Sequence, residues 1–74
     1  MNYLQFIQQK PILTGRITVN GKQKEGVFIP LWSRYSNSMV YHYHTPKGNK
    51  GSGGFTMMRA YSLLNNGILS IIED

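Results

Sequence analysis

The spacing of hydrophobic and polar residues predicts three strands in the first part of the chain. Residues 12–19 and 39–45 alternate apolar or β-branched side chains with polar ones, and residues 26–32 form an apolar run of strand length. Asn20-Gly21 separates the first two segments, and both residues tolerate the positive φ that a tight hairpin needs. We therefore predict an antiparallel β-meander over roughly residues 12–45.

A helix is predicted for residues 56–66. Thr56 is a suitable N-cap, and apolar residues then recur on one face of the segment. Gly67 is a stop signal, because glycine readily adopts the left-handed conformation that follows a last helical turn. Residues 68–72 are then a short final strand or a tail packed on the sheet.

The N-terminal segment has two interpretations. Asn2 can cap a short helix over residues 2–9, and Pro11 would end it, because the residue before a proline avoids the helical region. Leu4 and Phe6 also alternate with polar residues, so a strand is the alternative.

These elements predict an α+β fold: a three-stranded antiparallel β-meander packed against a C-terminal helix, with a short N-terminal helix or strand and a short last strand. With 74 residues and no Cys, the chain is a single small basic domain, residues 1–74, without disulfides. The runner-up is a five-stranded small barrel in which residues 3–9 and 68–72 are strands. The small core leaves a homodimer as an alternative to a monomer.

The register of the first hairpin decides which residues share a face. A two-residue loop would pair Val19 with Lys22 and Ile17 with Lys24, mixing apolar and basic side chains. A three-residue loop, or a one-residue bulge at Gly26, flips the second strand and avoids this, and we prefer that register. One face then holds Leu13, Ile17, Val19, Val27, Ile29 and Leu31, and the other holds Arg16, Thr18, Lys24, Phe28 and Trp32.

Two features of the second strand stay open. Phe28 and Trp32 can alternatively pack under the N-terminal segment as a second small core. Pro30 has no N–H to donate, so the strand should have an open edge near it.

The charge of the chain limits the kinds of binding partner that we expect. Lys plus Arg is 8 and Asp plus Glu is 3, for a formal net charge of +5. All the cations and only one acid, Glu25, lie between residues 10 and 59, so that stretch carries +7. This imbalance favours an anionic partner: nucleic acid (DNA or RNA), an anionic nucleotide or an acidic protein surface. No apolar run approaches the length of a membrane span, and no signal peptide is evident, so we expect a cytoplasmic protein without membrane association.

The leading hypothesis is a small non-enzymatic nucleic-acid-binding protein. Lysines and arginines would neutralise phosphates, and aromatic side chains would stack on bases. The residues predicted to make these contacts are Arg16, Lys22, Lys24, Trp32, Arg34, Tyr35, Tyr41, Tyr43, Lys47, Lys50 and Arg59.

We predict that the protein is not an enzyme, with no catalytic residue, no metal and no cofactor. The acids are Glu25 and the C-terminal pair, which cannot form a catalytic carboxylate cluster. His42 and His44 share one face of a strand, and two alternatives remain for them. We favour imidazoles that hydrogen-bond locally or touch a ligand; the alternatives are two metal ligands without an evident third, and the general acid and base of a metal-independent ribonuclease.

The segment 47–54 has four glycines and two lysines, and it predicts a flexible cationic loop that either connects elements or contacts an anion.

Residues 41–60 resemble the end of an integrase arm-site-binding domain. The resemblance is carried by a Gly/Lys turn followed by Gly54, Phe55, Thr56 and Ala60. It implies a three-stranded sheet on one helix whose outward side chains read DNA in the major groove. Phe55 and Thr56 are adjacent here, which departs from that family's pattern, and Met-Met-Arg replaces its Lys/Glu-rich helix start.

A second function fits the same composition. A small isolated basic domain also suits an inhibitor or adaptor, of the sort that a phage or other mobile element encodes, that binds an acidic host protein.

Overall fold

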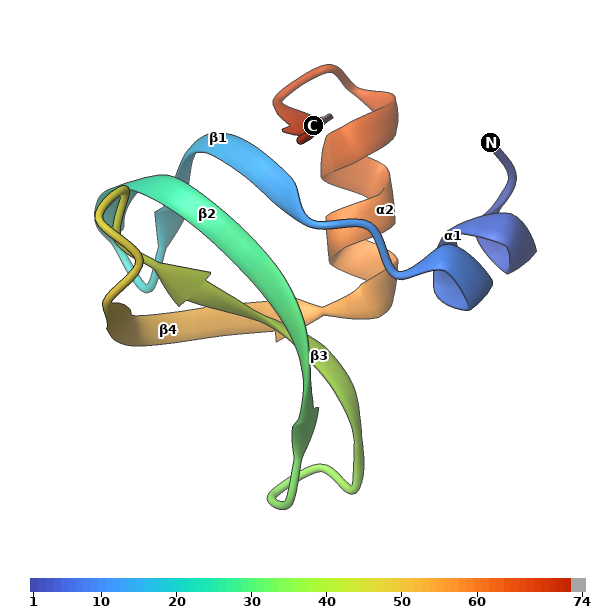
Figure 1. Ribbon diagram of the computed structural model, residues 1–74, viewed down its shortest axis with the longest axis horizontal. Coiled ribbons are helices and arrows are strands. Elements are labelled where there is room, and N and C mark those ends of the chain that lie inside the picture. Colours follow the sequence, from blue (N-terminus) through green and yellow to red (C-terminus); the bar gives the residue numbers. More distant parts are fainter. Residues whose placement is uncertain (73–74) are drawn as a thin grey trace.

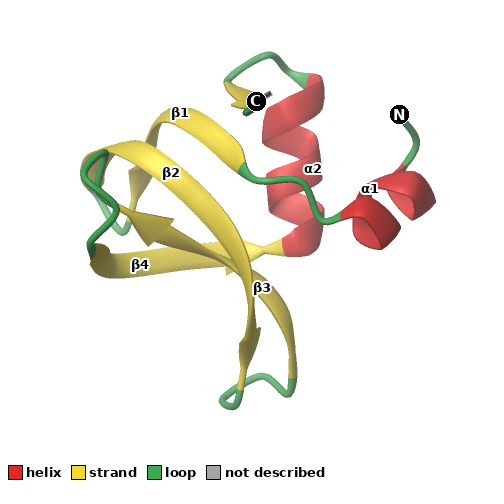
Figure 2. Cartoon of the chain, viewed as in Figure 1, coloured by secondary structure: helices red, strands yellow, loops and turns green. Residues whose placement is uncertain are grey.

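The computed structural model describes residues 1–72 and has an α+β fold (Figures 1 and 2). A five-stranded antiparallel sheet has the order β4-β3-β2-β1-β5. The elements in chain order are α1 (Tyr3–Gln9), β1 (Leu13–Val19), β2 (Lys22–Ser33), β3 (Ser38–His44), β4 (Lys50–Thr56), α2 (Met57–Asn65) and β5 (Leu69–Ile71). The predicted fold class, the meander of β1, β2 and β3, and the C-terminal helix are confirmed.

Both helices begin at the predicted caps. Asn2 and Gln5 form a capping box, each side chain binding the backbone of the other, which compensates for the short length of α1. The Thr56 hydroxyl accepts from the Arg59 N–H at 3.2 Å, and Gly67 has φ +76° after α2 ends. The N-terminal segment is therefore a helix, and the strand alternative is wrong. Neither helix within residues 1–72 is long and apolar enough to cross a membrane.

The hairpin of β1 and β2 corrects the preferred register. Asn20 and Gly21 both have positive φ and form a two-residue turn, so Val19 pairs with Lys22 and Ile17 with Lys24. The sheet tolerates Lys24 on its inner face because its ammonium lies 5.4 Å from the centre of the Tyr43 ring. Phe28 consequently points inward and is fully buried, whereas Val27, Ile29 and Leu31 share the outer face.

The strand β4 was not predicted. Part of the segment expected to be a loop pairs with β3, after a turn closed by two hydrogen bonds between the backbones of Thr45, Gly48 and Asn49. Its glycines permit close approach to β3: a Cβ at Gly51 would meet Tyr43 at 2.5 Å, and one at Gly54 would meet the Tyr41 carbonyl at 2.5 Å. The barrel alternative was thus right in the number of strands, but it assigned residues 3–9, which are helical, in place of β4.

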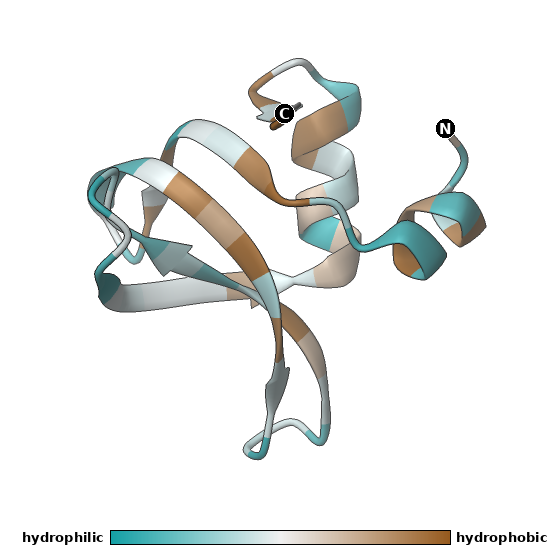
Figure 3. Ribbon diagram, in the orientation of Figure 1, coloured by the Kyte–Doolittle hydropathy of each residue, from teal (hydrophilic) through white to brown (hydrophobic). Residues whose placement is uncertain are grey.

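The sheet curls around its core. The hairpin of β1 and β2 bends over β4, so β1 contacts β4 although no backbone ladder joins them (Figure 1). A Cβ at Gly53 would come within 3.0 Å of Val19 across this junction. The helix α2 packs against β3, β4 and β5, and α1 packs against α2. Figure 3 shows the hydrophobic middle of β2 crossing above the neutral, glycine-rich β4.

The core is largely aromatic. Phe6 and Tyr41 stack with ring centres 5.6 Å apart, and Phe55 lies 6.2 Å from Tyr41 and 5.3 Å from Phe28. Tyr43 continues this row, 5.6 Å from Phe28. Both tyrosine hydroxyls are satisfied, because Tyr41 donates to the Pro11 carbonyl and Tyr43 to the Glu25 carbonyl. Burial raises the pKa of Tyr41, since the phenolate form would lose its hydration.

The close packing of β2 on β3 makes Gly26 intolerant of substitution. A Cβ there would lie 2.3 Å from the His44 carbonyl oxygen, so we expect Gly26→Ala to lower the free energy of unfolding by about 2 kcal/mol or more. Gly21→Ala is the matched control: its Cβ meets no atom within 4 Å, and only its φ of +79° costs about 1 kcal/mol. Urea denaturation of both variants measures the difference. Equal losses would contradict the β2–β3 packing described.

Candidate nucleic-acid interface

Exposed aromatic and cationic side chains gather at the end of the β2–β3 hairpin. This hairpin extends away from the rest of the sheet, so Trp32 is 59% exposed and Tyr35 is fully exposed at its turn (Figure 1). Both residues, together with Arg34 and with Lys50 from β4, line a hollow of about 350 Å³. Four of the predicted contact residues, from β2, the β2–β3 turn and the edge strand β4, are therefore brought together.

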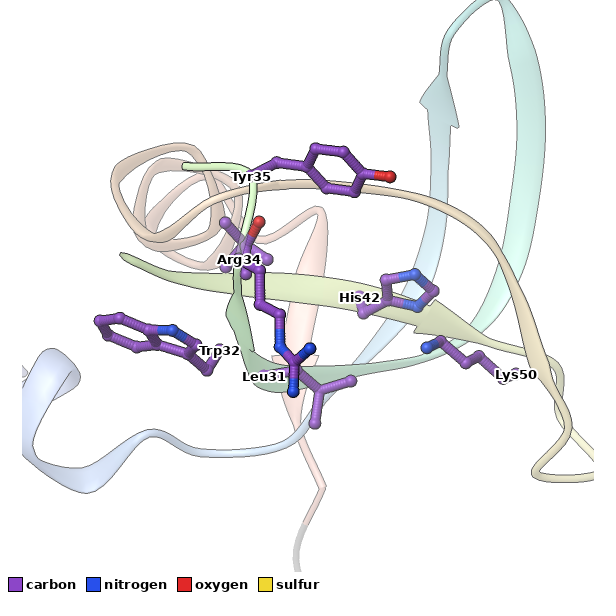
Figure 4. A pocket seen from close by; sticks show the side chains of 8 residues that line it. Leu31, Trp32, Arg34, Tyr35, His42 and Lys50 are labelled. Carbon is purple, nitrogen blue, oxygen red and sulfur yellow. The ribbon is translucent and has the colours of Figure 1, made fainter. Parts of the chain in front are cut away.

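The close view of this first hollow shows how the side chains lie (Figure 4). The Tyr35 ring lies along one side, and the Arg34 guanidinium reaches toward Leu31. His42 and Lys50 lie beyond the guanidinium, and Trp32 points away from them. The hollow thus combines the open ring face of Tyr35 with the positive charges of Arg34 and Lys50, and the Trp32 ring lies at its edge, turned away from them.

A second group of cations lies where the β1–β2 hairpin meets β4. Lys22 and Lys24 line a hollow of about 170 Å³ together with Ser52 and Gly53. Arg59, in the first turn of α2, lines a neighbouring hollow of about 240 Å³. The curl of the sheet creates this group, because it carries the hairpin end to the glycine-rich strand.

The two groups are connected by a further hollow of about 410 Å³ between the β2–β3 turn and β4. Adjoining hollows share lining residues, and in order along the surface these are Val40 and His42, Gly54 and Phe55, and Val19 and Asn20. We call these four hollows together the track. It passes over Gly53 and Gly54, whose lack of side chains leaves the path open between the cations at either end.

The track carries positive charge toward both of its ends, and no Lys or Arg in the described part of the chain lines its middle hollow. Five cations line it, and no carboxylate of residues 1–72 does; the cations are Lys22, Lys24, Arg34, Lys50 and Arg59. The predicted contact residue Arg16 lies outside it. Its guanidinium binds the Glu25 carboxylate at 2.7 Å on the exposed outer face, and this hydrogen bond, with the Coulombic attraction, raises the pKa of Arg16.

Three other predicted contact residues lie elsewhere. Tyr41 is fully buried and Tyr43 nearly so, and neither presents a ring face to a ligand, so their assignment as stacking residues is wrong. Lys47 is exposed in the β3–β4 turn and lines none of the four hollows.

Some residues that line the track were not predicted from the sequence. His42 lines two adjoining hollows, and it faces outward because its neighbours Tyr41 and Tyr43 face inward. Gly53 and Gly54 were assigned to a loop, although the adjacent glycines were a signal of backbone that passes close to another group.

Comparisons with known proteins give no assignment: no family model, no curated protein and no solved structure matches this chain.

The exposure of Trp32 separates it from the core. We expect Trp32→Ala to change the free energy of unfolding by less than about 1 kcal/mol, because its ring buries little surface. Phe28→Ala, on the same face of the same strand but fully buried, should cost about 3–5 kcal/mol. Urea midpoints of the two variants test this contrast. A loss for Trp32→Ala as large as that for Phe28→Ala would place Trp32 in the core.

Proposed function

We propose that this protein binds single-stranded nucleic acid along the track. The observation that carries the proposal is the continuity of the track: five cations without an opposing carboxylate line hollows that share residues from one end to the other. A small anion would need only one of these hollows, whereas a polyanion with regularly spaced phosphates uses all of them.

The exposed aromatic residues favour unpaired bases. Tyr35 offers a ring face beside Arg34 at one end of the track, and the exposed Trp32 ring lies at the edge of the same hollow. Aromatic faces stack on any base that is free of a duplex. The outer face of β2 and β3 carries the aliphatic side chains of Ile29, Leu31 and Val40, which offer few hydrogen bonds to base edges. Duplex reading by the sheet, as the integrase resemblance implies, is therefore the less favoured mode of binding.

An acidic protein surface is the competing partner, because the same cations would serve it. The two partners differ in their dependence on salt and in the role of stacking. A gel-shift experiment with single-stranded and duplex oligonucleotides at two salt concentrations separates them. We expect a shift that is stronger for the single strand and weakens steeply with salt. No shift at low salt would favour the protein partner, and a stronger duplex shift would favour groove reading.

The positions of two lysines provide a matched test of the track. Lys50→Ala should weaken binding of all sequences alike and reduce the slope of log K against log salt by roughly one unit, as expected for one lost phosphate contact. Lys47→Ala removes the same charge only three residues away but outside the track, so its slope should stay close to that of the unsubstituted protein. Fluorescence anisotropy titrations across salt concentrations measure both. Equal effects would indicate attraction by net charge alone.

Stacking predicts a different signature for Trp32. Trp32→Ala should lose about 1–3 kcal/mol of binding free energy with an almost unchanged salt slope, because it removes a ring face and no charge. The same titrations measure this variant, and Met58→Ala, an exposed apolar residue of α2, is the control with no expected effect. Unchanged affinity of Trp32→Ala would remove the aromatic part of the proposal.

A further inference from the structure

The two histidines form a close pair on the outer face of β3. His42 and His44 are separated by one residue in a strand, so their side chains point to the same side of the sheet. Their ring centres are 5.7 Å apart and their planes meet edge to face at 68°. Both side chains are half-buried, which limits the rotamers that they can adopt.

Main-chain carbonyls hold the inner nitrogen of each ring. The Nδ1 atom of His42 lies 3.1 Å from the Tyr43 carbonyl oxygen, and that of His44 lies 3.4 Å from the His42 carbonyl oxygen. A neutral imidazole that donates through Nδ1 carries its lone pair on Nε2. Metal-binding histidines in proteins usually have this arrangement, with one nitrogen fixed by a carbonyl or carboxylate and the other on the metal.

From this geometry we propose that His42 and His44 together bind a divalent transition-metal ion, with Zn²⁺ as the reference case. With Zn–N bonds of about 2.0–2.1 Å, each ring centre lies about 3.2 Å from the ion, so two rings sharing an ion have centres at most about 6.4 Å apart. The observed 5.7 Å fits within that limit. The proposal goes beyond nucleic-acid binding and does not depend on it.

The surroundings set the character of this site. Within residues 1–72 no third His, Cys, Asp or Glu joins the pair, so water fills the remaining coordination positions and the site is open. Imidazole donors favour Zn²⁺, Ni²⁺ and Cu²⁺ over Mg²⁺ or Ca²⁺. Lys50 pairs with His44 in the β3–β4 ladder and, like Arg34, shares a hollow with His42, so positive charge opposes the ion and keeps the affinity moderate.

Zinc binding by this chain is simple to interpret, because its sequence has two histidines and no cysteine that would compete for the ion. Isothermal titration of the purified protein with Zn²⁺ alone, in a buffer that does not bind zinc, should give one site per chain. His42→Gln and His44→Gln should each weaken binding by about tenfold or more, because the second imidazole binds intramolecularly only when the first is present. The double variant gives the background from all other groups.

Lys50 supplies a test of opposite sign. Lys50→Met keeps the aliphatic stem but removes the charge, so it should strengthen Zn²⁺ binding about two- to fivefold, whereas Lys47→Met in the adjacent turn should leave it unchanged. Circular dichroism confirms that each variant is folded. The proposal is wrong if Zn²⁺ up to about 1 mM binds no better than to the double variant. It is also wrong if either single histidine variant loses only about twofold, as two independent imidazoles would.

Discussion

The row of packed aromatic rings is the interaction on which the rest of the structure depends. It begins with Tyr3 and Tyr61, passes through Phe6 and Tyr41 to Phe55 and Phe28, and ends at Tyr43, with adjacent centres 5.2–6.2 Å apart. Its members come from both helices and from β2, β3 and β4, so the row joins both helices to the sheet. In a chain of 74 residues without disulfides, such large side chains supply the apolar area that short strands and short helices cannot.

This row also decides what the outer surface presents. Because side chains alternate across a strand, burying Tyr41 and Tyr43 requires Val40, His42 and His44 to face outward. The same constraint in β2 buries Phe28 and turns Ile29 and Leu31 out, and it leaves Trp32 exposed only because the hairpin continues past the core. The track and the histidine pair are therefore consequences of which residues the core requires.

The sequence predicts those features that are set by neighbouring residues. Asn2, Thr56 and Gly67 mark the helix ends through local hydrogen bonds and backbone preferences, and Asn20-Gly21 marks the first turn. It does not predict features set by distant contacts. Alternation separates Tyr41 from His42 but does not indicate which faces the core, and Lys24 is acceptable on the inner face only because the Tyr43 ring lies beneath it. The glycines of β4 have low strand propensity, and the reason for them, contact with Tyr43 and the Tyr41 carbonyl, lies on another strand.

The candidate site shows the same division. Its cations were identified by residue type, but their grouping depends on the curl that brings Lys22 and Lys24 to Ser52 and Gly53. The glycines of β4 are needed both for folding and for an open track. A side chain at Gly54 would collide with the Tyr41 carbonyl and push β4 away from β3, and it would also obstruct the track between Arg59 and Lys50. Substitution of Gly54 would therefore affect folding and binding together. The charged residues at the ends of the track are better positions for separating an effect on binding from an effect on folding.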